Sequence, residues 1–261
     1  MSYKNKVIYL VFLLTNIVFY LINLLWAKDN FLFLHSQVGW DCFTGIVKAL
    51  EGLRDGLGIL NIAYGLYGHG PGSAIYFLYQ ALIGLLFSFV DDISVVLGNC
   101  ILFTLTSICV YKIGKLIKNE FTGLAAVALL SVYPGIYGIV RTTMSGNIAI
   151  PLVALTILML LRVEHFQSFL KSMLLGFVLG LGAWAKHFFI YFVGGSLIYE
   201  LNSWQIAFRK GYLGSRRAKT LINVFLVIFL ILLVGLPFYI LNFVPVRQGF
   251  YGHNMFTDKH L

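Results

Sequence analysis

Charge is scarce in this sequence. Only 11% of the 261 residues are charged, against about 25% in a typical soluble domain, and 59% are hydrophobic, against about 45–50%. A mean hydropathy of +0.87 excludes an ordinary soluble domain, a disordered chain and a collagen-like chain. We therefore expect an integral-membrane protein. At about 20 residues per span plus connections, the chain has room for roughly seven or eight helices and one sizeable loop.

Cysteine and acidic residues are also few. The three cysteines, Cys42, Cys100 and Cys109, are too scattered for a disulfide framework or a zinc site. Ten acids face nineteen lysines and arginines, which gives a formal net charge of +9. Such an excess is found in nucleic-acid-binding proteins, but a polytopic membrane protein carries basic residues at its cytoplasmic surface for topological reasons. We expect the lipid bilayer as a partner and no nucleic acid.

Apolar runs of span length dominate what is present. They predict an all-α fold, a polytopic transmembrane helix bundle forming one integral-membrane domain over residues 1–261. The first run, 7–26, follows Lys4 and Lys6 and ends without a small-residue cleavage site, so we expect an uncleaved helix with a cytoplasmic N-terminus. The later apolar segments are 73–90, 93–113, 121–140, 147–161, 172–184, 188–201 and 221–243.

Residues 27–72 form the first long departure from hydrophobicity, and we expect them to be the first non-cytoplasmic loop. Within it, apolar residues from Trp40 to Leu53 recur every three or four positions, the pattern of a helix with one apolar face. Gly56 and Gly58 then end the pattern. The stripe predicts an amphipathic helix lying on the outer membrane surface.

Four basic groups orient the helices. They hold twelve of the nineteen basic residues: Lys4 and Lys6; Lys112, Lys115 and Lys118; Arg162 and Lys171; and Arg209, Lys210, Arg216, Arg217 and Lys219. The positive-inside rule places all four in the cytoplasm. Segment 73–90 then cannot be a simple crossing, so we expect a re-entrant or interfacial helix. The loop 27–72, the turn 141–147 and an exposed tail, 244–261, share the outer side.

Two residues of the first loop are candidates for chemistry. Asp41 lies at the start of the amphipathic helix, where a carboxylate is either a favourable helix-start charge or a catalytic acid or base. His69 lies in the glycine-rich turn 67–72, just before an apolar helix. The flanking glycines leave its ring accessible, either to solvent alone or to a ligand.

Two basic residues lie at the outer ends of apolar helices. Arg141 ends one helix, and Lys186 has apolar residues on both sides. A charge buried in a bilayer costs several kcal/mol unless it faces a partner or a polar cavity, and the alternative is that both side chains extend to the interface. The functional interpretation is a pair of cations facing an anionic group such as a lipid phosphate.

Five motifs occur in order over most of residues 1–200. They are an early first-loop acid (Asp41), a His/Lys-Pro-Pro type turn before an aromatic helix (69–77), a basic Gly-containing helix end before a small-residue helix (111–116 and 122–126), a Ser-Pro…Arg…acid turn (131–134 through 141–147), and a Gly-Leu…Thr-Lys helix (176–186). Together they resemble the GT-C-type membrane glycosyltransferases, the polyprenol-dependent class that includes protein O-mannosyltransferases and aminoarabinose transferases.

The resemblance implies transfer of a sugar from a polyprenyl-phosphate donor to an acceptor on the non-cytoplasmic side. It implies Asp41 as general base, a donor phosphate bound by Arg141, Lys186 and His69, and Asn147 in the substrate loop. It also implies a metal or phosphate site at the second-loop acid and the His/Lys turn, and the sequence leaves open whether a divalent metal ion is the cofactor. The lack of any Asn-x-Ser/Thr sequon favours a bacterial plasma membrane.

Two departures from the family pattern keep an alternative open. Asn147 stands where relatives have Asp or Glu, and relatives carry more helices and a large C-terminal part. The alternative is a non-catalytic, GT-C-like lipid-binding or complex subunit with a partner membrane subunit, or a truncated fragment. A solute transporter predicts inverted repeats, and the sequence has none that we detect.

Overall fold

A computed structural model describes residues 3–30, 37–59, 62, 74–87, 90–144, 146–185 and 188–241. This part of the chain contains no strand, and the predicted all-α fold is confirmed. Its helices are α1 (Tyr3–Asp29), α2 (Gln37–Arg54), α4 (Ala74–Phe87), α5 (Asp92–Ile117), α6 (Glu120–Val132), α7 (Pro134–Val140), α8 (Gly146–Val163), α9 (Phe169–Ala185), α10 (Phe189–Arg209), the 3₁₀ turn η2 (Gly214–Arg216) and α11 (Arg217–Leu241). The predicted tail, 244–261, lies outside the described residues.

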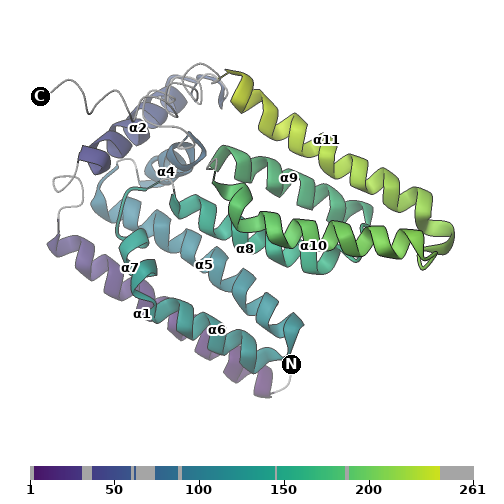
Figure 1. Ribbon diagram of the computed structural model, residues 1–261. Coiled ribbons are helices and arrows are strands. Elements are labelled where there is room, and N and C mark those ends of the chain that lie inside the picture. The colour runs from purple at the N-terminus through teal and green to yellow at the C-terminus, as the bar shows by residue number, and fades with distance from the viewer. Residues whose placement is uncertain are drawn as a thin grey trace, which may run out of the picture.

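The long helices run between two ends of a bundle (Figure 1). The N-terminus, the end of α5 and the start of α6 lie together at the lower right, and the α10–α11 connection lies at the right. Helices α2, α4 and α7 lie at the opposite, upper-left end. The helix directions therefore bring all four basic groups to one end, which we call the basic end. That this end faces the cytoplasm stays a prediction.

Four described helices are long and apolar enough to cross a membrane: Lys6–Asp29, Asp92–Ile117, Gly146–Val163 and Gly214–Pro237. The pair α6 and α7 makes a fifth if it is counted as one bent span, and α4 and α9 are shorter apolar helices. The chain is thus a multi-helix membrane protein, and the predicted total of seven or eight segments is not confirmed.

The predicted span 121–140 is not one straight helix. α6 and α7 meet at an angle of 64° between Tyr133 and Pro134. A proline disfavours helical geometry in the residue before it, and Tyr133 is extended, with φ −72° and ψ 120°. Proline fits the first turn of a helix, where its missing N–H has no partner to lose, so a new helix starts at once. The bend directs α7 toward the end that carries α2 and α4 (Figure 1).

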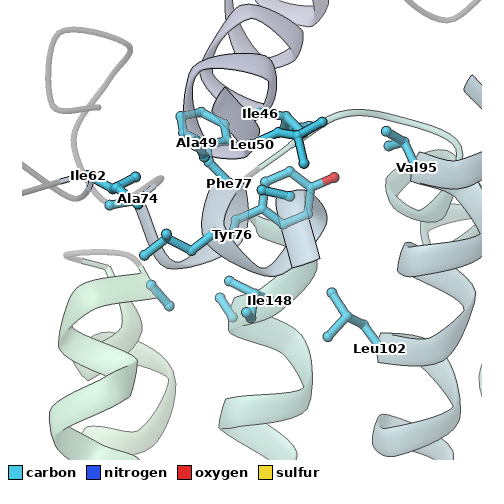
Figure 2. Close-up of a cluster of buried hydrophobic side chains, with 14 residues drawn as sticks. Ile46, Ala49, Leu50, Ile62, Ala74, Tyr76, Phe77, Val95, Leu102 and Ile148 are labelled. Carbon is cyan, nitrogen blue, oxygen red and sulfur yellow. The ribbon is translucent and has the colours of Figure 1, made fainter. Parts of the chain in front are cut away.

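α4 is a short helix at that end. Its 14 residues span about 21 Å, less than the roughly 30 Å of a bilayer core. Its apolar residues meet those of α2, α5 and α8 in one buried cluster, which includes Ile46, Tyr76, Phe77 and Ile148 (Figure 2). Its hydrogen bonds to α5 reach only the first turns of that helix, from Val95 to Asn99. A short helix held at one end of the bundle fits the predicted re-entrant or interfacial helix, which stays a prediction.

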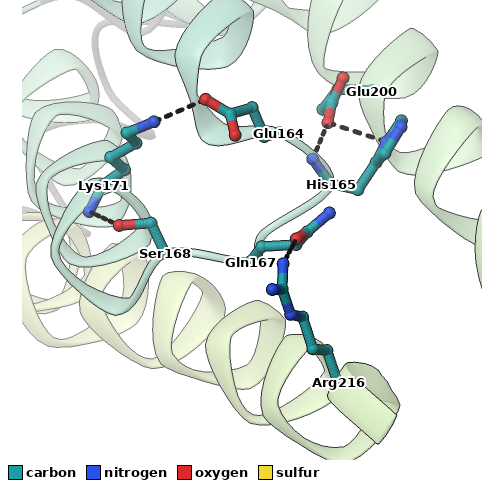
Figure 3. A network of polar contacts seen from close by, with 7 residues as sticks. All are labelled: Glu164, His165, Gln167, Ser168, Lys171, Glu200 and Arg216. Atoms are coloured by element: carbon teal, nitrogen blue, oxygen red, sulfur yellow. Dashed lines mark hydrogen bonds and ion pairs between the residues drawn. The ribbon is translucent and has the colours of Figure 1, made fainter. Parts of the chain in front are cut away.

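The basic end is fastened by the loop between α8 and α9. Three successive residues of this loop, 164–166, have positive φ values of 50°, 59° and 61° and reverse the chain. Figure 3 shows its polar contacts, which are Lys171 with Glu164 (2.8 Å), the His165 amide with Glu200 of α10 (3.0 Å) and Arg216 with Gln167 (2.7 Å). The loop thus ties α8 and α9 to α10 and η2, and it leaves the other end of the bundle free of these contacts.

Candidate functional site

Arg141 caps the C-terminus of α7, and its guanidinium is held from one side. Its Nε donates to Oδ1 of Asn23 on α1 at 2.8 Å, and its Cζ lies 4.9 Å from the ring centroid of Trp26 and 5.0 Å from that of Tyr137. Neither Nη group makes a hydrogen bond with a described residue. Partial burial lowers the pKa of Arg141, yet a guanidinium stays charged at any physiological pH. The arrangement holds the guanidinium in place and leaves its Nη groups available to donate hydrogen bonds to an anion.

The turn that follows Arg141 is built around the carbonyl of Thr142. This oxygen accepts a hydrogen bond from Nδ2 of Asn147 at 2.8 Å and another from Nδ2 of Asn99 at 3.1 Å. Asn147 is nearly fully buried. Its amide group therefore shapes the turn from inside, and its predicted role in a substrate loop remains a prediction.

Asn99 of α5 is the hub of a buried polar network at the same end. Its Nδ2 also donates to the carbonyl of Val140 at 2.9 Å, and its Oδ1 accepts from the Tyr76 hydroxyl at 3.0 Å and from Nε2 of Gln80 at 2.8 Å. Asn99 is 1% exposed. One side chain thus joins α4, α5 and the last carbonyl of α7.

Three other predicted site residues fall where the structure gives no side-chain position. Asp41 belongs to the second turn of α2, but its side chain lies outside the described part, as do His69 and Lys186. Ala185, which precedes Lys186, is buried in the same cluster as Ile46 of α2. α2, which contains Asp41, and the end of α9, which precedes Lys186, therefore both pack against α4. The distances among the predicted side chains stay untested.

An apolar cavity opens beside the Arg141 turn. It has a volume of about 500 Å³ and is bounded by Ile139 of α7 and Gly146 of α8, which flank the turn. Its other walls come from α5, α6, α8, α10 and the residue that caps the start of α10: Thr106, Val110, Ile113, Leu130, Ala149, Ile150, Val153, Ala154, Ile157, Phe188 and Phe192. Aliphatic and aromatic side chains line it almost throughout. Such a cavity suits a hydrocarbon chain rather than a polar ligand.

The geometry can be compared with known proteins. A family model described as dolichyl-phosphate-mannose-protein mannosyltransferase matches residues 71–237. The chain belongs to this family. Comparison with curated proteins and with solved structures gave no significant match. The suspected membership in the GT-C-type glycosyltransferases is thus confirmed.

The family match covers most of the candidate site. It extends over Asn99, Arg141, Asn147 and Lys186, and it begins after Asp41 and His69. One of the motifs that carry the resemblance, formed by segments 111–116 and 122–126, has a packing role in the structure. A Cβ on Gly114 would lie 2.7 Å from Cα of Gly123, so this glycine pair permits the close contact of α5 and α6.

The described residues do not fit a metal site of the kind that the resemblance implies. Among the residues whose side chains the structure describes, no group of three His, Cys, Asp or Glu could hold a metal ion. Asn147, at the position of the relatives' second-loop acid, turns its amide nitrogen to the Thr142 carbonyl. A carboxylate ligand is therefore missing from this turn.

Sequence reasoning found Arg141 but missed the residues that hold it. Asn23 is an amide in the middle of an apolar run and carries no charge that a hydropathy pattern would reveal. The available signal was a polar side chain inside a span, which in a bilayer needs a partner. Asn16, Asn23 and Asn99 share that signal, and all three are buried.

Proposed function

We propose that the protein transfers a sugar from a polyprenyl-phosphate-linked donor to an acceptor on the non-cytoplasmic side of the membrane. The donor sugar is mannose, the sugar in the family's description. The observation that carries the proposal is the fixed guanidinium of Arg141, whose Nη groups make no hydrogen bond with a described residue, at a turn that borders an apolar cavity of about 500 Å³. A polyprenyl phosphate offers both complementary parts, a phosphate and a hydrocarbon chain.

The phosphate is the leaving group of this reaction. As the bond between the sugar's anomeric carbon and the phosphate oxygen breaks, negative charge grows on that oxygen. Arg141 stabilises this charge through its Nη donors, because a charge-assisted hydrogen bond in a site with little water is stronger than one in bulk water. Its Nε bond to Asn23 and the rings of Trp26 and Tyr137 keep the guanidinium in place before the donor arrives. Lys186 and His69 belong to the same phosphate site in this proposal.

Asp41 is the general base. Its carboxylate takes the proton from the acceptor hydroxyl while the hydroxyl oxygen bonds to the anomeric carbon from the side opposite the phosphate, which inverts the configuration at that carbon. The products are the glycosylated acceptor, the free polyprenyl phosphate and a protonated Asp41. α2, which carries Asp41, packs on α4 at the same end of the bundle as the Arg141 turn (Figures 1 and 2).

A second candidate function rests on Asn147. Relatives have an acid at this position, and the amide that replaces it here is buried and hydrogen-bonded within its own turn. This favours a non-catalytic member of the family that binds the lipid-linked donor for a partner membrane subunit. Both candidates need the same donor site, so binding and turnover must be measured separately.

The test uses the full chain in proteoliposomes with mannose-labelled polyprenyl phosphate and an acceptor pool extracted from native membranes. We expect label transfer by the wild type and a loss on the order of 100-fold in Arg141→Ala, the scale of removing one donor to a developing negative charge. Arg162→Ala, which removes a guanidinium from the last turn of α8, serves as the matched control and should retain activity.

Two outcomes would contradict the proposal. Donor binding without any transfer by the wild type would favour the non-catalytic candidate. If Arg141→Ala transferred sugar as fast as Arg162→Ala, Arg141 would not be part of the site that binds the donor phosphate.

A further inference from the structure

Asn99 holds the main chain on both sides of Arg141. Its Nδ2 donates to the carbonyl of Val140, the preceding residue, at 2.9 Å and to that of Thr142, the following residue, at 3.1 Å. These bonds determine where the Cα of Arg141 lies relative to α5. The Arg141 side chain, in contrast, is held by a different helix, through Asn23 of α1.

The other face of the Asn99 carboxamide belongs to α4. Its Oδ1 accepts from the Tyr76 hydroxyl and from Nε2 of Gln80, and Nε2 of Gln80 also lies 3.2 Å from the Tyr76 hydroxyl. A Cβ added to Gly98 would clash with the Gln80 amide, so α4 and α5 approach each other closely at this point. The Arg141 turn and α4 thus share one rigid hydrogen-bonded contact.

α4 is in turn locked to the helix that carries Asp41. Gly45 of α2, one turn after Asp41, faces the Phe77 ring of α4, and a Cβ on Gly45 would lie 2.6 Å from that ring. Ile46 and Ala49 of α2 are fully buried in the same cluster (Figure 2). A chain of close contacts therefore runs from α2 through α4 and Asn99 to Arg141.

We infer that Asn99 is a positioning residue: its carboxamide ties the Arg141 turn to α4 and thereby keeps the arginine in register with α2, the helix of the general base. The inference rests on the proposed function, which assigns Arg141 to the donor phosphate and Asp41 to the acceptor. Asparagine suits the position because one planar group must donate two hydrogen bonds and accept two within a small space. Aspartate offers no donor to the two carbonyls.

The kinetic test compares Asn99→Ala and Asn99→Asp with Thr104→Val. Thr104 lies on the same helix, and its hydroxyl joins a network with Tyr20 and Asn16 of α1 that does not include the turn. We expect both Asn99 variants to lose on the order of 30-fold in kcat with less than about a threefold change in the donor KM, since a small misplacement of a reacting group is costly. Thr104→Val should stay within about twofold of the wild type.

A double-variant cycle separates positioning from loss of folding. If Asn99 acts through Arg141, Asn99→Ala should change the residual rate of Arg141→Ala by less than about twofold. A further loss of 30-fold in that background would show that Asn99 acts elsewhere and would overturn the inference. A loss of kcat in Thr104→Val as large as that in Asn99→Ala would also overturn the inference.

A spectroscopic test needs no turnover. With Trp26 kept as the sole tryptophan, by phenylalanine at positions 40, 184 and 204, its fluorescence reports the guanidinium that lies 4.9 Å away. Asn99→Asp should shift the emission in the same direction as Arg141→Ala, and Thr104→Val should not. Unchanged emission in Asn99→Asp contradicts the inference. A shift in a protein that transfers no sugar leaves the inference standing and contradicts the proposed function alone.

Discussion

Amide side chains, rather than acids, organise the turn after α7. Asn147 and Asn99 both donate to the carbonyl of Thr142, and the main-chain amide of Asn147 donates to the carbonyl of Met144 at 3.0 Å. The resemblance to the GT-C-type pattern implies an acid at the position of Asn147. In this chain Asn147 stabilises the conformation of the turn through its hydrogen bond to Thr142. It therefore does not take over the role of the acid in the family pattern.

Changing Asn147 to the acid of the family pattern should therefore not restore a missing function. In Asn147→Asp a buried donor is replaced by an acceptor that faces the Thr142 carbonyl. We expect a loss of about 1–3 kcal/mol in the free energy of unfolding and no gain in transfer. Thermal unfolding in detergent measures the first effect, and Asn202→Asp, at an exposed position of α10, is the control. Higher transfer in Asn147→Asp than in the wild type would show that the turn accepts the acid.

At this scale the sequence predicted charges better than amides. Arg141 stood out because a charge beside an apolar run demands an explanation. Asn23 and Asn99 did not, because an amide scarcely changes the hydropathy of a helix and its partners come from other helices. Their roles depend on contacts between residues more than 40 positions apart, which no local pattern contains.

Among the helices, α9 packs closely on α11 through two of its glycines. A Cβ on Gly176 of α9 would lie 2.9 Å from the carbonyl oxygen of Val227, and one on Gly180 would lie 2.6 Å from Cβ of Val234. Small residues let helix backbones approach and gain van der Waals contact where lipid offers no hydrophobic drive for association. Gly176 begins the Gly-Leu…Thr-Lys motif, so part of that motif serves helix packing.

We expect Gly176→Ala to separate α9 from α11. The added methyl group meets the backbone of α11, which cannot rotate away, so we predict a loss of about 1–3 kcal/mol in stability. Gly194→Ala on α10 is the control, since nothing lies within 4 Å of its added Cβ, and alanine there should be neutral or stabilise the helix by up to about 1 kcal/mol. Equal unfolding temperatures for the two variants would contradict the contact.

The element scale also shows what hydropathy cannot resolve. The apolar runs located the helices from α5 to α11, and the glycines after α2 marked its end. The bend between α6 and α7 was missed because both sides of Pro134 are equally apolar, and only the geometry imposed on Tyr133 separates them. Proline within an apolar run was the available signal.

At the scale of the whole molecule, the helix directions agree with the positive-inside arrangement. All four basic groups lie at one end, and the Arg141 turn lies at the other (Figure 1). The sequence predicted this arrangement well because it depends only on the order of spans and charges. The roles of the first-loop site residues were predicted by resemblance, and the described residues leave the distances between their side chains untested.

Sided labelling tests this topology. In a chain whose native cysteines are replaced by serine, Lys118→Cys and Ser215→Cys should react with a membrane-impermeant maleimide only in inside-out vesicles. Met144→Cys, in the turn after Arg141, should react only in right-side-out vesicles, because it lies at the opposite end of the bundle. The residues at all three positions are exposed on the surface of the protein. Labelling of Met144→Cys and Ser215→Cys from the same side would contradict the arrangement.

The central claim is that a carboxylate of the first outer loop serves as the base for sugar transfer. The most direct measurement is mannose transfer from labelled polyprenyl phosphate by Asp41→Asn, beside Asp55→Asn, which changes an exposed acid just after the other end of α2. We predict a loss of 100-fold or more in Asp41→Asn, with donor binding unchanged, because general-base catalysis contributes about 10²–10⁴-fold. Asp55→Asn should match the wild type. Equal transfer by the two variants would contradict the account.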